Sequence, residues 1–402
     1  MPRKKRPVSM INGNGKVRPE WRYQRRSKIQ QIRESQWFNL LLFFLSIYVF
    51  IIGLKLMGSG LKGMGKDFSE SLITTVENPF VGLAIGVLAT AVIQSSSATT
   101  SMVVLLVADD PSFFPYAIPI IIGANIGTSV TNIIVSLGHI RHPPSFKRAF
   151  SGALVHDFFN LFAAGLIFPA EQLVRIFTGK GILERLGEGA ANLLVGTGGF
   201  EFDLIDRMLD PVLTPTKDMI LDLGFYPEIM LLVVGLVILF VSLSMITKSA
   251  RRAIEGKVQK VVDRVLFRNA GTSFGFGVGL TSFVQSSSVT TSLVVPLVGS
   301  GILTVEQIFP YTLGANVGTT VTALLAAVAA GMGKMALAIS LVHLFFNMIG
   351  IVILYPMRKA PIWLAKKAAV YFADNRKFTI LFILGLFFVL PGLIILLDRL
   401  VF

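Results

Sequence analysis

The chain has no cysteine, no glycosylation sequon and few charged residues. The absence of Cys excludes disulfide bonds, thiol catalysis and thiolate metal sites. Only 15% of the 402 residues are charged, whereas 53% are hydrophobic and the mean hydropathy is +0.70. A soluble domain of this length is far less apolar. The composition therefore indicates an integral membrane protein whose compartment has to be read from its topology.

The few charged residues leave long uncharged runs between them. A transmembrane helix needs about 20 consecutive, mostly apolar residues, and most of the runs reach that length. They occupy residues 35–54, 78–108, 111–140, 158–170, 229–247, 269–305, 307–333, 335–357 and 378–397. This pattern predicts an all-α, polytopic membrane protein.

The net charge of +14 is concentrated in particular loops rather than in one domain. Residues 171–225 hold nine acidic and five basic side chains, whereas four other segments are strongly basic: 1–36, 138–149, 248–270 and 357–377. Because cytoplasmic loops carry the excess of Lys and Arg, we expect these four segments and the N-terminus in the cytoplasm, and 171–225 outside. The positive net charge is thus explained by the cytoplasmic loops and does not indicate nucleic-acid binding. We expect the lipid bilayer as a partner, and no nucleic acid.

Three motifs occur twice in the chain. The pairs are QSSSATTS at 94–101 with QSSSVTTS at 285–292, GANIGTSVT at 123–131 with GANVGTTVT at 314–322, and VHDFFN at 155–160 with VHLFFN at 342–347. The first two pairs share one offset of 191 residues, and the third pair is offset by four residues fewer. Agreement at matched spacing indicates an internal duplication.

The serine-rich segments 78–108 and 271–305 differ from the other apolar runs. Each is too short for two full spans and has its hydroxyl cluster near the centre, which is typical of a re-entrant helical hairpin with the polar run at its tip. If the hairpins do not cross the bilayer, each half crosses it three times, so the two halves have opposite orientations. The alternating loop charges agree with such inverted-topology repeats.

The predicted organisation has five parts. They are a basic cytoplasmic tail at 1–36, a first transmembrane repeat at 37–170, an extracellular or periplasmic connector at 171–225, a second transmembrane repeat at 226–357, and a basic cytoplasmic segment with a final transmembrane helix at 358–402. Each repeat is expected to contain one re-entrant hairpin and one broken helix.

The hairpin tips predict an anion site. Interrupted helices of inverted repeats meet near the bilayer midplane, where secondary transporters bind substrate. Serine is a favoured N-cap, so each tip begins a helix with unpaired backbone N–H groups and a positive dipole end. Two such helix starts facing each other bind anions, with hydroxyl and amide groups as further donors. The predicted ligands are Gln94, Ser95, Ser96, Ser97, Gln285, Ser286, Ser287 and Ser288.

No Lys or Arg lies in a predicted midplane segment, so a bound anion needs a cation to compensate its charge. The glycines of each GAN-x-GT motif predict a helix break that exposes carbonyl groups, and Asn and Thr oxygens complete a shell that suits Na+. We expect His156 and His343 to be packed histidines. Asp157 is matched by Leu344 in the second half, and is either a cation ligand or a helix-end charge facing the cytoplasm.

The duplicated motifs argue against two other classes of function, an enzyme and a scaffold. An intramembrane enzyme would use Ser95 as nucleophile and His156 as base, but neither serine run has a Gly-x-Ser-x-Gly frame and a second copy would be redundant. A scaffold, in which Ser and Thr only pack helices, does not require polar residues duplicated at membrane depth. We therefore expect a protein that is not an enzyme.

The paired QSSS runs, together with IPIIIGANIGTSVTN, KRAFSGALVHDFFN and LGANVGTTVTALLAA, resemble the type II sodium-dependent phosphate cotransporter family over about 78–170 and 271–397. The resemblance implies a secondary transporter for inorganic phosphate, with Na+ as the coupling ion and no cofactor, and with phosphate at the two QSSS tips. It also implies sodium ligands among Gln94, Asn125, Thr128, Gln285, Ser286, Asn316 and Thr319. The sequence does not separate phosphate from arsenate, or uptake from export.

The connector departs from the animal members of that family, which carry a cysteine-bearing, glycosylated loop between the halves. Residues 171–225 contain neither Cys nor a sequon. This difference predicts a prokaryotic member, located in the inner or plasma membrane of the cell.

Overall fold

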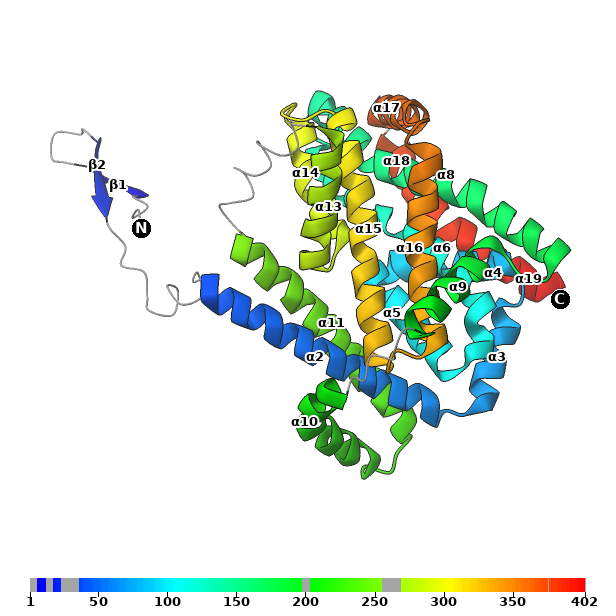
Figure 1. Ribbon diagram of the computed structural model, residues 1–402. Helices are drawn as coiled ribbons and strands as arrows, with labels where there is room; N and C mark the ends of the chain where they lie inside the picture. Colours follow the sequence, from blue (N-terminus) through cyan, green and yellow to red (C-terminus); the bar gives the residue numbers. More distant parts are fainter. Residues whose placement is uncertain are drawn as a thin grey trace.

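The protein is almost entirely helical (Figure 1). The structure is a computed structural model that describes residues 6–11, 17–22, 36–196, 203–254, 269–374 and 376–401. An antiparallel ribbon of β1 (Arg6–Ile11) and β2 (Val17–Arg22), within the predicted N-terminal tail, is the only β-structure in these residues. Seven helical segments of the described chain are long and apolar enough to cross a membrane. The prediction of an all-α, polytopic membrane protein is confirmed.

The helices follow the order of the repeated motifs. The first half contains α2 (Gln36–Gly63), α3 (Lys66–Val76), α4 (Pro79–Ile93), α5 (Ser96–Asp109), α6 (Phe114–Gly127), α7 (Ser129–Ser136) and α8 (Pro143–Thr178). The connector contains α9 (Ile182–Gly196) and α10 (Asp203–Leu221). The second half contains α11 (Pro227–Ile254), α13 (Ala270–Val284), α14 (Ser287–Gly299), α15 (Val305–Ala329) and α16 (Lys334–Leu354). The chain ends with α17 (Lys359–Asp374), α18 (Arg376–Leu384) and, after a π-helical turn, α19 (Leu390–Val401).

Each serine-rich segment forms two short helices that meet at a glutamine. The arms have 13 to 15 residues and extend about 20 Å, less than the ~30 Å of a hydrocarbon core. Gln94 and Gln285 turn the chain with left-handed φ angles of 60° and 57°. Hydroxyl contacts join the two arms, at 3.1 Å for Thr90 with Thr99 and at 2.7 Å for the equivalent pair of the second half. These are the proportions of the predicted hairpins.

The first arm of each hairpin packs closely on the helix that carries GAN-x-GT. A Cβ atom on Gly86 of α4 would lie 2.1 Å from the carbonyl oxygen of Ile120, and one on Gly277 of α13 would lie 2.2 Å from that of Tyr311. Both contacts occur at the same 191-residue offset, so the duplication in the sequence is also a duplication of backbone contacts. The helices can approach this closely only because these positions have no side chain.

The prediction of a broken helix in both halves is wrong for the second. α15 runs from Val305 to Ala329 without interruption. In the first half, Thr128 separates α6 from α7 but has helical angles, φ −59° and ψ −32°, so the chain is not redirected. The motif glycines serve packing instead, since a Cβ on Gly123 or Gly314 would lie 2.1 Å from a carbonyl oxygen of the facing hairpin arm.

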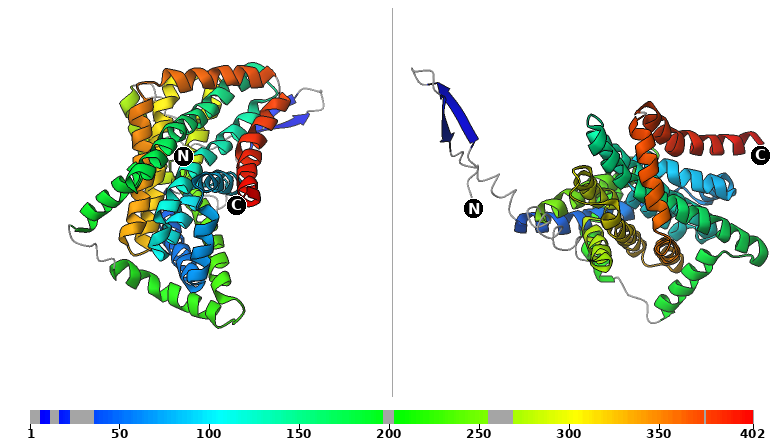
Figure 2. Two further views of the ribbon diagram at one scale, coloured as in Figure 1. Left: turned by 90° about the vertical axis from the view of Figure 1, so that its right-hand side faces the viewer. Right: turned by 90° about the horizontal axis from the view of Figure 1, so that it is seen from above.

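The two halves interlock. α2 and α11 pack side by side along their lengths (Figure 1), and a Cβ on Gly235 would lie 2.7 Å from the backbone nitrogen of Met57. The second arm of each hairpin contacts the opposite half, since α5 packs on α15 and α16 while α14 packs on α7 and α8. The last helix, α19, lies at the edge of the bundle (Figure 2), where Asp398 accepts a 2.7 Å hydrogen bond from Asn78 of the first hairpin.

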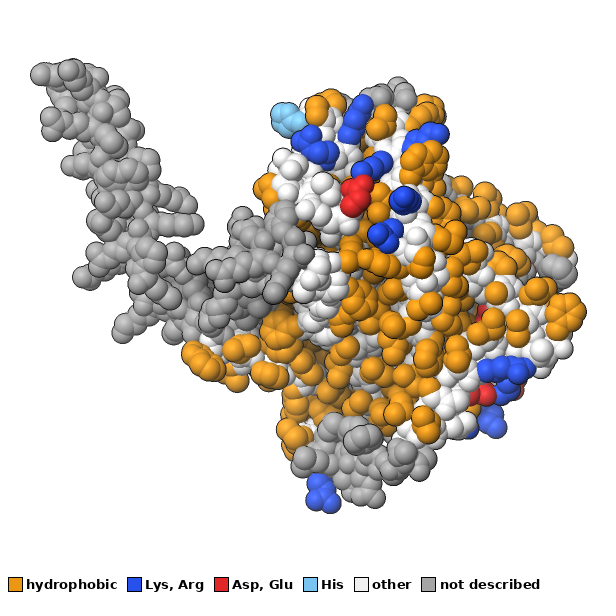
Figure 3. All heavy atoms as spheres, turned by 45° about the horizontal axis from the view of Figure 1, so that its top comes forward, with side chains coloured by type: hydrophobic (Ala, Val, Ile, Leu, Met, Phe, Trp, Pro, Cys, Tyr) orange, Lys and Arg blue, Asp and Glu red, His pale blue; other side chains and the backbone are white. Residues whose placement is uncertain are grey.

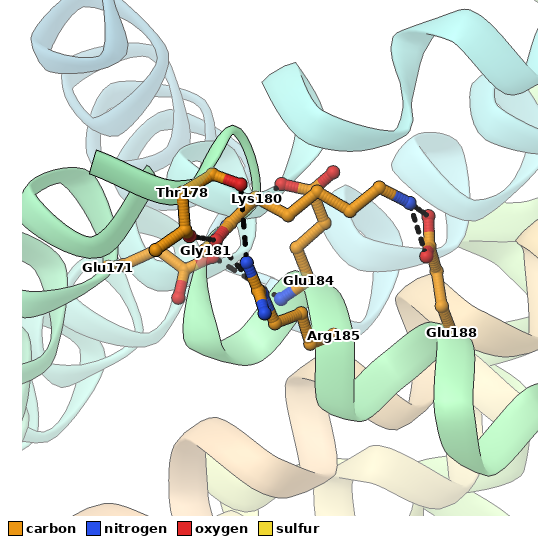
Figure 4. Close-up of polar contacts among 7 residues, drawn as sticks. All are labelled: Glu171, Thr178, Lys180, Gly181, Glu184, Arg185 and Glu188. Atoms are coloured by element: carbon orange, nitrogen blue, oxygen red, sulfur yellow. Dashed lines mark hydrogen bonds and ion pairs between the residues drawn. The ribbon is translucent and has the colours of Figure 1, made fainter. Parts of the chain in front are cut away.

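A buried carboxylate fixes the turn between α8 and α9 (Figure 4). Glu171 is 2% exposed and accepts hydrogen bonds from the backbone N–H groups of Leu183 (2.6 Å) and Glu184 (3.3 Å). These N–H groups belong to the first turn of α9 and have no partner within that helix. A Cβ on Gly181 would lie 2.0 Å from the carboxylate oxygen. The connector therefore begins with a fixed turn, which directs α9 onto α16.

The substitution Gly277→Ala should destabilise the fold, because the added methyl group meets a backbone oxygen that cannot rotate away. Overpacking of this kind costs about 1 to 3 kcal/mol or more. Gly279→Ala on the same helix is the matched control, since nothing lies within 4 Å of its Cβ position and Ala is the better helix former. Thermal unfolding of the purified chain in detergent measures both. Equal stability of the two variants would contradict the packing role.

Candidate functional site

The tip glutamines hold the same position in both halves. The Gln94 amide nitrogen donates to the Ala91 carbonyl group, and its oxygen accepts a 2.9 Å hydrogen bond from Thr131. In the second half, Gln285 accepts a 2.8 Å hydrogen bond from Thr322 and donates to a carbonyl group of its own helix. The left-handed tips are thereby tied to α7 and α15. A non-glycine residue in this conformation is strained and persists only where its surroundings fix it.

Serine caps begin the second arm of each hairpin. The Ser95 hydroxyl accepts a hydrogen bond from the Ala98 N–H group at 3.2 Å, and the Ser286 hydroxyl accepts one from Val289 at 3.3 Å. The predicted N-caps are therefore confirmed. The earlier N–H groups of α5 and α14 have no acceptor within their helices, which leaves two helix starts able to bind an anion.

The two tips touch each other. Ser97 donates to the backbone carbonyl group of Gln285 at 3.1 Å and lies 3.4 Å from the Thr322 hydroxyl. The serine runs that are separated by 191 residues in the sequence thus share one place in the structure. Gln285 is 4% exposed, whereas Gln94 is exposed, so the first tip is the more open of the two.

Three tip hydroxyls have no protein partner. Ser96, Ser287 and Ser288 are 6%, 3% and 6% exposed, and their side chains make no hydrogen bond to any described residue. A serine hydroxyl group has one O–H donor. At two helix starts, these three side chains therefore have donors available for a ligand or water.

Each GAN-x-GT asparagine bonds to a histidine of the other half. His156 donates from Nε2 to the Asn316 side-chain oxygen at 2.6 Å, and His343 donates from Nε2 to the Asn125 side-chain oxygen at 3.3 Å. Asn160 connects the two pairs, because its oxygen accepts from Asn316 at 2.7 Å and its nitrogen donates to the Asn125 carbonyl group at 2.8 Å. One continuous chain of hydrogen bonds therefore crosses between the halves.

Asn132 makes the two halves chemically different. It donates to Nδ1 of His156 at 3.0 Å and accepts from Thr291 of the second hairpin at 2.9 Å. The equivalent position in the second half is Ala323. Nδ1 of His343 accordingly has no hydrogen-bond partner.

Asp157 is a buried acid without a hydrogen bond. It is 0% exposed, both carboxylate oxygens lack a partner, and its polar neighbour is the Ser129 side chain. A buried carboxylate in such surroundings is costly unless a cation or a proton neutralises it. The geometry thus does not fit a helix-end charge facing solvent.

Of the seven predicted sodium ligands, Gln94, Gln285 and Ser286 lie at the hairpin tips, and the other four fall into two groups. The side chains of Asn125 and Asn316 lie in the central chain of hydrogen bonds, whereas Thr128 and Thr319 bond to carbonyl groups of their own helices at 2.9 and 3.0 Å. A hydroxyl oxygen that donates in this way still has lone pairs for a cation. No group of three or more His, Cys, Asp or Glu side chains suited to a metal ion occurs in the described part of the chain, which leaves neutral oxygens as the main candidate ligands.

Several polar residues of this centre were not predicted as site residues. Thr131 and Thr322 end the duplicated GAN-x-GT-x-V-T motif, and Asn160 and Asn347 end the duplicated His-x-Phe-Phe-Asn motif. Their recurrence in both halves is the signal that could have identified them. Asn132 has no such counterpart, so its role becomes visible only in the fold.

The chain was compared with known proteins. Residues 49–184 and 238–390 match the model of the Na+/Pi-cotransporter family. The chain is 31% identical over 421 residues to sodium-dependent phosphate transport protein 2A of Rattus norvegicus, which covers 87% of the chain and 66% of that relative. It is 32% identical over 437 residues to sodium-dependent phosphate transport protein 2B of Homo sapiens, with 86% and 63% covered.

The chain spans slightly less than two thirds of the length of these relatives. No solved structure matches it. Seven apolar helices and the family match together show an integral membrane protein. The match extends over both halves and includes both hairpins, so the chain belongs to the Na+/Pi-cotransporter family.

Proposed function

We propose that the protein is a secondary active transporter that couples inward Na+ movement to the uptake of inorganic phosphate by alternating access. The observation that carries this proposal is the meeting of two serine-capped helix starts, where the side chains of three buried serines make no hydrogen bond to a described residue. A tetrahedral oxyanion accepts hydrogen bonds in several directions, which suits donors arriving from two opposed helices. The names of the similar proteins point to the same cargo.

The proposed phosphate ligands are the eight residues Gln94 to Ser97 and Gln285 to Ser288. Ser95 and Ser286 act mainly by capping, since their hydroxyl groups accept bonds from their own helices. Ser97 holds the tips together through Gln285. Ser96, Ser287 and Ser288 are the side chains whose donors are available to the anion.

The proposed sodium ligands are the oxygens of Gln94, Asn125, Thr128, Gln285, Ser286, Asn316 and Thr319. We add Asp157 to these, because a fully buried carboxylate with only the Ser129 side chain as its polar neighbour is better explained as a cation ligand than as a helix-end charge. It would contribute a full negative charge to the first half alone, since Leu344 takes its place in the second.

The alternative of a serine hydrolase requires a contact between Ser95 and His156. The Ser95 hydroxyl caps α5, and the two ring nitrogens of His156 bond to Asn132 and Asn316. A general base must lie within hydrogen-bonding reach of its nucleophile. These contacts favour transport over hydrolysis.

Phosphate uptake into proteoliposomes tests the proposal and the site together. An inward Na+ gradient should drive uptake, and an equal K+ gradient should not. Ser287→Ala removes one donor to an anion, a loss of roughly 1.5 to 3 kcal/mol, so phosphate affinity should fall about ten- to hundredfold. Ser292→Ala is the matched control on the same helix, because its hydroxyl bonds to the Val289 carbonyl group. Unchanged affinity in Ser287→Ala would refute the tip as the phosphate site.

The orientation within the cell membrane is also proposed, with the N-terminus in the cytoplasm and the two halves inverted. The alternating charge of the loops supports it. In the cysteine-free chain, Glu77→Cys before the first hairpin should react with an impermeant thiol reagent from outside, and Gly271→Cys before the second should react only from the cytoplasm. Both positions are exposed. Labelling of both from one side would exclude inverted repeats.

A further inference from the structure

A second polar site lies away from the hairpin tips, at the end of the molecule that the proposed orientation places in the cytoplasm. It is a pocket of about 320 Å³ between the start of α8, the turn from α14 to α15, and α17. The pocket is separate from the serine runs, and none of the proposed phosphate or sodium ligands lines it. Its lining residues belong to none of the three duplicated motifs.

The rim of the pocket is cationic. Among the described residues, Lys147, Arg148 and Lys366 line it together with one carboxylate, Glu306, which pairs with Lys366 at 2.5 Å. Figure 3 shows Lys and Arg side chains gathered around an acidic group on this face. Both members of the ion pair are about half exposed, and exposed pairs of this kind contribute little. An incoming anion can therefore replace Glu306 as the partner of Lys366.

Arg148 joins the rim to the second hairpin. Its Nε donates to the Gly299 carbonyl group at the end of α14 at 3.0 Å, and Ser145 donates to the same oxygen at 3.0 Å. A guanidinium group has five N–H donors, so this bond does not exhaust its capacity. An anion bound by Arg148 would lie at the contact between α8 and the hairpin.

Apolar side chains form much of the rest of the pocket lining, and α17 forms one of its walls. Val298, Leu303 and Val305 of the lining are buried, and Val370 is half exposed beside them. α17 exposes Trp363 and Tyr371, residue types that favour the headgroup level of a bilayer, and Lys367 stacks over the Trp363 ring at 4.7 Å. Cationic groups beside buried apolar side chains match the two ends of a phospholipid.

We propose that this pocket binds the phosphoryl headgroup of an acidic phospholipid of the cytoplasmic leaflet. Basic pockets between helices on this side of a membrane are suited to such headgroups. The phosphoryl oxygens accept from Arg148, Lys147 and Lys366, while the glycerol and the first acyl carbons cover the apolar part of the lining. Free inorganic phosphate shares the phosphoryl chemistry but has nothing to place against the valines and leucine.

Calorimetric titration of the full chain in a neutral detergent tests the proposal, with dioctanoyl-phosphatidylglycerol as the probe and dioctanoyl-phosphatidylcholine as the neutral lipid. Phosphatidylglycerol should bind and phosphatidylcholine should not. Each basic residue near an anionic headgroup contributes an affinity factor of about five, so Lys366→Gln and Lys147→Gln should each weaken binding by about that factor. Glu306→Gln should change the affinity in the opposite direction, because it removes the competing carboxylate.

Lys359→Gln is the matched control, since it removes the same charge from the same helix outside the pocket lining. It should leave the affinity unchanged. An equal loss in Lys359→Gln and Lys366→Gln would show diffuse attraction and overturn the proposal. Equal binding of the two lipids would do the same. A third titration with inorganic phosphate separates the two sources: if its affinity equals that of the lipid and falls in Lys366→Gln, the pocket takes free phosphate and the lipid assignment is wrong.

Discussion

The fold depends on an exchange of hydrogen bonds between the halves, in which one Asn side chain of each half accepts from a His of the other half. Asn316 receives its hydrogen bond from His156, and Asn125 receives its hydrogen bond from His343. In the middle of a membrane protein no bulk water replaces a lost partner, so an amide buried without one costs several kcal/mol. In each half, the asparagine side-chain oxygen has its histidine partner in the other half. The exchange joins α8 to α15 and α16 to α6, and each of these helix pairs also packs together.

The exchange creates a centre with matching geometry and unequal chemistry. Both tips have a left-handed glutamine, a serine cap and a threonine partner at corresponding positions. Asn132 and Asp157, however, have Ala323 and Leu344 as counterparts. The carboxylate and the additional amide are therefore confined to the first half, where the more exposed tip also lies. The duplication accounts for the matching backbone geometry of the two halves, and a few unmatched side chains make the halves chemically different.

The sequence predicted the features that depend on local chemistry. The hairpins, with their tips in the polar runs, and the serine caps all follow from short polar runs in apolar surroundings. It predicted a helix break from the GAN-x-GT glycines. Whether a glycine bends a helix or allows a neighbouring helix to approach depends on what packs against it. Here the backbones of Leu83 and Phe274 pack against these glycines. The partners of His156 lie 24 and 160 residues away, and no local pattern reveals them. Prokaryotic origin stays a prediction.

The central claim is that cations compensate the charge of the anion, because the hairpin tips offer only hydroxyl groups, amides and helix dipoles. Calorimetric titration of phosphate at several Na+ concentrations, with choline holding the ionic strength constant, tests it most directly. The account predicts that saturating Na+ raises phosphate affinity by about five- to 150-fold, a coupling of about 1 to 3 kcal/mol, and that phosphate tightens Na+ binding by the same factor. Thr319→Ala should reduce this dependence. A phosphate affinity that does not change with Na+ would contradict the account.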